Sequence, residues 1–269
     1  MRILLLFLRK ELKAIRSDSR VWPVYLVFPV LAIGLPTFLA TLAPLVIHQG
    51  MAKQDAGMLQ IAQLVRIMPD FASLSPEEGM TRYLLRSVAA LFLLMPVALS
   101  STSAAFSIVG EKQQRTLEPI LATPITDRQF LLGKLLAAAV PTVVMTWITA
   151  VVTISVVDIV TRGRYATALL PDRFWTLGLL ALAPLLATAV VLVTMRFSAK
   201  ATDPQATVQA TALAIIPGFL ILIALFGKVL TTYFTALWIA CVVMATIDMV
   251  LFRGNIRTFR REEILTRWK

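Results

Sequence analysis

The residues best able to do chemistry in this chain are few, and they lack the partners that catalysis or metal binding requires. His48 and Cys241 are the single histidine and the single cysteine. A zinc site needs several Cys, His or carboxylate ligands at short spacing, and a hydrolytic triad needs a histidine beside a nucleophile. Gly133 and Lys134 precede Leu135 in an apolar run, so they do not complete a phosphate-binding Gly-x-x-x-x-Gly-Lys-Ser/Thr loop. We therefore predict no catalytic, cofactor-binding or metal-binding residue.

Charged and polar residues gather instead in one segment, 110–134, between two long apolar runs. Glu111 and Glu118 are seven residues apart, so they would share a face if the segment is helical. Pro119 and Pro124 prevent one continuous helix, because each lacks an N–H and restricts the residue before it. We expect a short helix or two bent turns across the cytoplasmic ends of the flanking spans. A plain connecting loop is the alternative.

The elements that position this segment are membrane helices. The chain is 58% hydrophobic and 15% charged, with a mean hydropathy of +0.80, whereas soluble domains carry roughly a quarter charged residues. Apolar runs of about 20 residues are long enough to cross a bilayer as helices. We predict an all-α integral membrane protein with one domain, 1–269, and six spans: about 22–47, 86–109, 129–157, 174–195, 206–227 and 230–252.

The basic residues predict how these spans are oriented. Net charge is +11, and most of the 26 lysines and arginines fall in the termini and on their side of the membrane. The positive-inside rule then places both termini in the cytoplasm, in the cell inner (plasma) membrane. We expect residues 1–20 to form an amphipathic helix on the inner leaflet, with a cytoplasmic tail at 253–269. The charge indicates topology and lipid contact rather than nucleic-acid binding.

Capping and proline patterns predict helix starts and distortions. Ser75, with Pro76 next and Glu78 three residues on, is typical of a helix start that leads into the second span. Thr126 with Gln129 is a second capping box, which begins the third span. The first span contains several internal prolines, so we expect it to be kinked or broken.

Polar residues within the spans allow two interpretations. Ser100, Ser103 and Ser107 recur at helical spacing in the second span, and Thr207 and Thr211 do so in the fifth. Such stripes could line a substrate path between two protomers, or they could let helices pack closely through small residues, which is the commoner use.

Asp248 is the one acidic residue well inside the sixth span. An ionised carboxylate in the bilayer centre costs about 2.5–3.5 kcal/mol on insertion scales. We expect Asp248 to pair with Arg253 near the interface.

The central segment resembles the type-2 permease family of ATP-binding cassette transporters. The matching pattern is E-[KR]-x-x-x-T-L-E-x-[IL]-L-x-T-P-x-[ST], followed by G-K in the next helix. It is carried here by Glu111, Lys112, Thr116, Leu117, Glu118, Ile120, Leu121, Thr123, Pro124, Thr126, Gly133 and Lys134. The amphipathic start and the basic end are also similar to that family, so the resemblance covers essentially the whole chain.

The resemblance implies a six-helix half-transporter whose central segment is a coupling helix for a separate ATPase subunit. A second permease copy, identical or related, would complete the membrane part, and ATP and Mg would bind only to the ATPase. Apolar anchors surrounded by charges would form the docking surface. The implied ATPase contacts are Glu111, Arg115, Thr116, Leu117, Glu118, Ile120, Leu121, Thr123 and Pro124. Lys134 would extend to the cytoplasmic interface, as a simple anchor or in gating.

Other classes fit less well. An ion-coupled secondary transporter normally buries several ionisable residues along a relay, and an intramembrane enzyme needs catalytic groups that this sequence lacks. The short outer loops offer no docking domain for a binding protein, which favours export. The substrate is not specified by the sequence, although apolar spans favour an amphipathic or lipid-like cargo.

Overall fold

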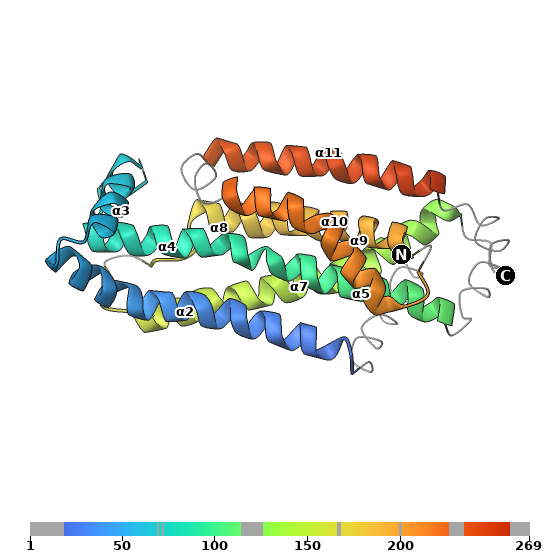
Figure 1. Cartoon of the computed structure of the whole chain (residues 1–269), viewed down its shortest axis with the longest axis horizontal. Coiled ribbons are helices and arrows are strands. Elements are labelled where there is room, and N and C mark those ends of the chain that lie inside the picture. Colours follow the sequence, from blue (N-terminus) through green and yellow to red (C-terminus); the bar gives the residue numbers. More distant parts are fainter. Residues whose placement is uncertain are drawn as a thin grey trace.

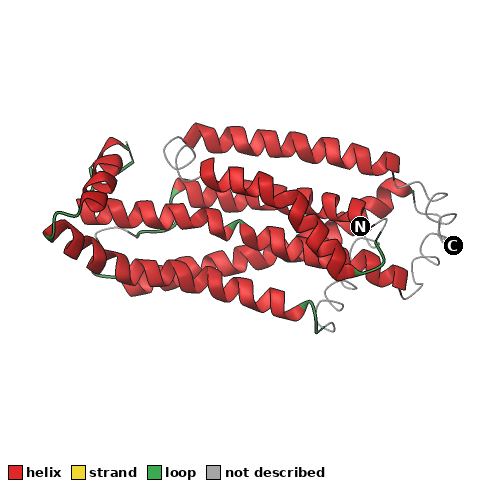
Figure 2. Ribbon diagram, in the orientation of Figure 1, coloured by secondary structure: helices red, strands yellow, loops and turns green. Residues whose placement is uncertain are grey.

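Every regular element of the computed structural model is a helix in the part of the chain that it describes, which is residues 19–68, 70–71, 73–113, 126–165, 168–198, 201–225 and 234–258 (Figure 2). The elements in order are α2 (Trp22–Ala52), α3 (Ala56–Ile67), α4 (Pro76–Phe92), α5 (Leu94–Gln113), α7 (Asp127–Thr161), α8 (Arg173–Leu177), the π-helix η1 (Gly178–Leu182), α9 (Ala183–Ser198), α10 (Pro204–Leu225) and α11 (Phe234–Thr258). The all-α prediction is confirmed for these residues.

The long helices run side by side along one axis, while α3 lies across one end of the bundle (Figure 1). α2 packs on α4 and α7, and α5 packs on α7, α9 and α10. α11 packs mainly on α9. The first turn of α2 and the last turn of α11 lie at the end opposite α3, together with the facing ends of α5 and α7 (Figure 1). That end is therefore the one that borders residues 114–125.

The helix α2 continues through three internal prolines, Pro29, Pro36 and Pro44. Of the predicted kink or break, the break is thus wrong for this helix, while a kink stays a prediction. Pro36 has no N–H for the carbonyl of Ala32. The hydroxyl of Thr153 on α7 lies 3.3 Å from that carbonyl and 2.8 Å from the Thr149 carbonyl of its own helix. A polar group of a neighbouring helix therefore faces the carbonyl that Pro36 leaves without a backbone donor.

The predicted second span, 86–109, is divided between two helices. α4 ends at Phe92 and α5 begins at Leu94, with a turn at Leu93 between them. Pro96 explains this position, because a proline in the first turn of α5 cannot donate to the carbonyl of Phe92.

Both predicted helix starts are confirmed. The Ser75 Oγ accepts from the N–H of Glu78 at 3.3 Å, and α4 begins at Pro76. At the start of α7, Gln129 N–H donates to Thr126 Oγ1, and the Gln129 side chain accepts from Thr126 N–H. This reciprocal pair satisfies two backbone donors that the helix leaves free.

Four helical stretches of the described chain are long and apolar enough to cross a membrane: Trp22–Ala52, Arg128–Thr161, Arg173–Ser198 and Phe234–Ile256. They correspond to the first, third, fourth and sixth predicted spans. The predicted fifth span overlaps α10, and the count of six stays a prediction. The predicted interfacial helix and coupling helix lie outside the described residues, apart from their edges. α11 continues to Thr258, past the predicted start of the tail at residue 253, and the bounds of that tail stay a prediction.

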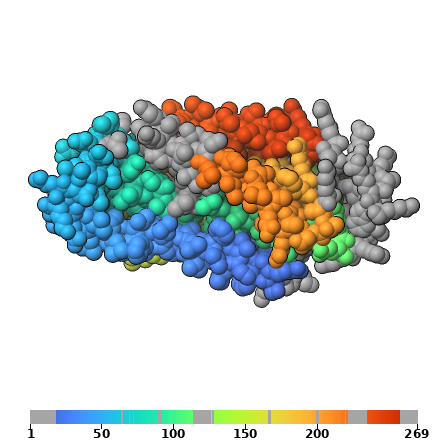
Figure 3. Space-filling view, viewed as in Figure 1, coloured from blue at the N-terminus to red at the C-terminus, as the bar shows by residue number. Residues whose placement is uncertain are grey.

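Apolar side chains cover the outside of the bundle as well as its core. Trp238, Ile239 and Val242 on α11 are more than half exposed, as are Val30 and Leu31 on α2. Figure 3 shows α2 and α11 along opposite edges of one face, with α10 between them. A soluble protein rarely exposes such extended apolar surfaces, whereas a bilayer would cover them. The chain is a multi-pass membrane protein.

Candidate functional site

The two helices that flank residues 114–125 are joined by a buried ion pair. Lys134 Nζ on α7 lies 2.6 Å from Glu111 Oε2 on α5, and the two side chains are 2% and 7% exposed. The same ammonium donates to Ser107 Oγ at 2.8 Å. Glu111 and Ser107 are four residues apart, so both face α7 from one side of α5. The ends of α5 and α7 are thereby held together.

The expectation that Lys134 extends to the cytoplasmic interface is wrong, because its ammonium points into the bundle. A lysine buried in apolar surroundings needs a counter-charge, and Glu111 supplies it one helix away. The carboxylate of Glu111 is engaged with this lysine within the protein. A contact between Glu111 and an ATPase stays a prediction.

The end of α5 also contacts the connection between α9 and α10. Lys112 Nζ donates to the Ser198 carbonyl at 2.6 Å, and Gln113 Nε2 donates to the Thr202 carbonyl at 2.9 Å. Burial lowers the pKa of Lys112 from its ordinary value. Cations at a helix C-terminus favourably satisfy the free carbonyls of the last turn. Lys112 and Gln113 therefore link the start of the 114–125 segment to α9 and α10.

The other predicted ATPase contacts lie outside the described residues. They are Arg115, Thr116, Leu117, Glu118, Ile120, Leu121, Thr123 and Pro124. The structure does place the helices on either side of them, α5 and α7, next to each other.

The serine stripe of α5 lies inside the bundle. The Ser103 Oγ is 2.5 Å from the Tyr25 hydroxyl of α2, which is also 3.4 Å from Thr142 Oγ1 of α7. Ser107 binds Lys134, while Ser100 is fully buried and its Oγ has no hydrogen-bond partner among the described residues. Within this chain the stripe is thus a contact between helices, and a substrate path along it stays a prediction.

The threonines of α10 have a similar setting. Thr207 and Thr211 are buried, and their hydroxyls donate to the carbonyls of Asp203 and Thr207 in the preceding turn. Such bonds keep a hydroxyl satisfied in apolar surroundings. α10 packs there on α5 and α9.

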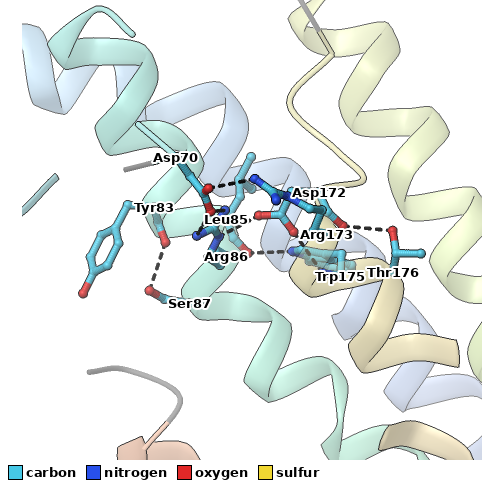
Figure 4. A network of polar contacts seen from close by, with 9 residues as sticks. All are labelled: Asp70, Tyr83, Leu85, Arg86, Ser87, Asp172, Arg173, Trp175 and Thr176. Atoms are coloured by element: carbon cyan, nitrogen blue, oxygen red, sulfur yellow. Dashed lines mark hydrogen bonds and ion pairs between the residues drawn. The ribbon is translucent and has the colours of Figure 1, made fainter. Parts of the chain in front are cut away.

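A second charged network joins elements at the end of the bundle near α3 (Figure 4). Arg86 of α4 is 3% exposed. Its Nε donates to Asp172 Oδ2 at 2.6 Å, and its terminal nitrogens lie 3.2 and 3.3 Å from Asp70 Oδ2. The guanidinium carbon is 4.4 Å from the ring centre of Phe71 and 4.0 Å from that of Phe174. The planar cation is therefore bound at its edge by carboxylates and at its faces by aromatic rings.

The acidic partners of Arg86 each hold a further element. Asp172 Oδ1 caps α8 by accepting from Trp175 N–H at 2.9 Å, and Asp70 Oδ1 accepts from Arg173 at 2.9 Å. Trp175 Nε1 donates to the Leu85 carbonyl of α4. The network therefore fixes α4, α8 and the chain after α3 relative to one another (Figure 4).

Asp248 does not pair with Arg253. At 3.6 residues per turn, five residues separate two side chains by about 140° around a helix. Arg253 is exposed, and the Asp248 carboxyl faces α9, where its Oδ2 lies 2.6 Å from Thr188 Oγ1. Arg196 of α9 does not pair with Asp248 either, because it donates to Asn255 Oδ1 and to the Leu251 carbonyl of α11.

Sequence reasoning missed the ion pair, the Arg86 network and the role of Tyr25. A signal existed for two of them. Lys134 lies deeper than a simple interfacial anchor would, and Arg86 begins an apolar span while Asp70 and Asp172 lie in the connections at the same end. Tyr25 gives no such signal, because a tyrosine in a span is ordinary.

Comparison with known families agrees with the resemblance that the sequence motif indicates. The family model described as "ABC-2 family transporter protein" matches residues 5–251. No curated protein matches the chain at a significant level.

Proposed function

Because the chain belongs to the ABC-2 transporter family, we propose that it is the membrane subunit of an ATP-driven exporter. A separate ATPase subunit hydrolyses ATP with Mg, and this chain moves an amphipathic or lipid-like substrate from the cytoplasmic side or inner leaflet. Two permease copies and two ATPase subunits form the complex in the inner (plasma) membrane. Both termini are cytoplasmic.

One observation carries this proposal: residues 114–125, which hold most of the family-like motif, connect two helices whose ends are joined by the Glu111–Lys134 ion pair. A force on the segment reaches α5 and α7 together because the pair resists their separation. Lys112 and Gln113 extend the same connection to α9 and α10. Closure of the ATPases would then shift several helices at once as a change between two packed states.

The small residues of α5 suit this mechanism. Buried serines and alanines let α5 lie close to α9 and α10 without large interdigitating side chains. Close packing through small residues allows helices to associate in a bilayer, where the hydrophobic effect does not drive their contact. α5 is therefore a suitable element to shift against its neighbours.

Charge reversal of Glu118 tests the proposal. In the complex with its ATPase, Glu118→Lys should leave membrane insertion intact and uncouple ATP hydrolysis from transport. Substrate-stimulated hydrolysis, screened over classes of amphipathic compounds, measures the coupling. Arg128→Glu is the matched control, because it is also a charge reversal and Arg128 is exposed outside residues 114–125, at the start of α7. Transport that is unaltered in Glu118→Lys would contradict the proposed docking surface.

A secondary transporter without an ATPase is the alternative. The described residues give it little support, since the buried charges Arg86, Glu111 and Lys134 form local pairs at the two ends of the bundle rather than a relay through it.

A further inference from the structure

Asp248 is an acidic residue that the proposed coupling does not use. Its surroundings indicate whether its carboxyl group is charged or protonated. It lies on α11 within the Phe234–Ile256 stretch that is apolar enough to span a membrane. Its Oδ2 is 2.6 Å from Thr188 Oγ1 on α9. Its Oδ1 is buried and has no hydrogen-bond partner among the described residues.

The hydrogen bonds of the Thr188 hydroxyl bear on whether the Asp248 carboxyl group is protonated. Thr188 Oγ1 lies 2.6 Å from Asp248 Oδ2 and 2.8 Å from the Leu185 carbonyl oxygen. A hydroxyl has one hydrogen and two lone pairs, and a carbonyl oxygen has no hydrogen to give. If Thr188 donates to Leu185, the short contact with Asp248 needs a hydrogen on the carboxyl group.

The unpartnered oxygen supports the same assignment. An ionised carboxylate shares its charge between two oxygens, and each needs donors when water is absent. Here Oδ1 has no donor within the described residues. In the neutral acid, Oδ1 is an uncharged carbonyl oxygen, whose burial costs far less than that of a charged one.

The charged groups on the neighbouring helices do not compensate a negative Asp248. The helices packed on α11 are α9, η1, α8 and α7. Arg196 of α9 is bound to Asn255 and Leu251, Arg173 of α8 pairs with Asp70, and Lys134 of α7 pairs with Glu111. Asp158 of α7 pairs with Arg162, while Arg128 and Arg253 are exposed. No ion pair with Asp248 is formed within the described part of the chain.

We propose that Asp248 is a proton-binding site in the membrane, held as the neutral acid, with its O–H donating to Thr188 and Thr188 donating to Leu185. The ligand of this site is a proton, and the site joins α9 to α11. Loss of the proton leaves one hydrogen for two acceptors, so Thr188 must abandon either Leu185 or Asp248.

Infrared difference spectroscopy tests this assignment directly. The permease complex in lipid is compared with Asp248→Asn at pH 7, in the region where protonated carboxyl groups absorb. The wild type should show a carbonyl band that Asp248→Asn lacks. Asp158→Asn is the control: Asp158 is ion-paired and substantially exposed, so this variant should lose a carboxylate band and keep the protonated one. Loss of only a carboxylate band in Asp248→Asn would overturn the proposal.

Thermal stability across pH gives an independent readout. The folded protein binds a proton that an unfolded, hydrated carboxyl group would release, so this contribution to stability is present at low pH and is lost as pH rises. The asparagine side chain in Asp248→Asn is neutral at every pH, and its amide can donate to Thr188. This variant should therefore unfold at a less pH-dependent temperature than the wild type. An equal pH dependence in the two proteins would contradict the site. Neither measurement depends on transport or on an ATPase.

Discussion

Lys134 Nζ lies 2.6 Å from Glu111 Oε2, and this ion pair joins the two helices that enter and leave residues 114–125. Both side chains are almost completely buried. A buried pair of this kind adds modestly to stability, but removing one partner leaves a charge without compensation. The ion pair therefore fixes the positions of α5 and α7 relative to each other where they flank the proposed coupling segment, residues 114–125.

Removing Lys134 should destabilise the permease strongly. Lys134→Met leaves Glu111 buried and charged, and we expect the free energy of unfolding to fall by about 3–5 kcal/mol. The double variant Glu111→Gln/Lys134→Met should recover most of this loss, because neither charge remains. Denaturation of the purified protein in detergent measures the effect. Arg162→Met is the control: its pair with Asp158 is exposed, so the change should be within about 1 kcal/mol. Equal losses in the single and double variants would argue against the pair.

Arg86 should not tolerate replacement by lysine. Lysine keeps the charge but lacks the planar fork that contacts Asp70, Asp172 and the two rings. We expect Arg86→Lys to lower the free energy of unfolding by about 1.5–3 kcal/mol, the range for hydrogen bonds to charged groups. Arg164→Lys provides the comparison, because Arg164 is about half exposed and its ion pair with Glu77 is long, at 3.9 Å. Similar effects of the two substitutions would show that the contacts of Arg86 contribute no special stability.

The cap of α7 should matter measurably. Thr126→Ala removes the acceptor for Gln129 N–H, and losing an N-cap typically costs about 0.5–2 kcal/mol. Thr126→Ser keeps the hydroxyl and should behave as the wild type. The readouts are the unfolding free energy and the rate of proteolysis near the start of α7. Identical proteolysis of all three proteins would contradict a stabilising cap.

Ser100 separates the two interpretations of the serine stripe. Its hydroxyl is buried without a hydrogen-bond partner among the described residues, and such groups cost about 1–3 kcal/mol. Helix packing predicts that Ser100→Ala is as stable as the wild type or more so, with unchanged transport. Transport by the complex and unfolding in detergent are measured on the same preparation. Reduced transport at full stability would support a substrate path.

Local patterns in the sequence predicted the helix starts well. Thr126 with Gln129, and Ser75 with Glu78, act on backbone groups within four residues, so their geometry follows from spacing alone. Long-range pairing could not be read in this way. Arg86 and Asp172 are 86 residues apart, and their contact depends on how the helices pack. The contact of Thr153 on α7 with the Ala32 carbonyl of α2 likewise depends on helix packing. The orientation of Asp248 could have been predicted, since helical rotation alone separates it from Arg253.

The most direct test of the proposed function is purification of the tagged permease from its native membranes, followed by assay of ATP hydrolysis and transport in lipid vesicles. We predict that an ATPase subunit co-purifies and that transport requires it together with ATP. We further predict that Glu118→Lys abolishes the link between hydrolysis and transport. Cargo movement by the permease alone, with no ATPase present and no need for ATP, would contradict the account.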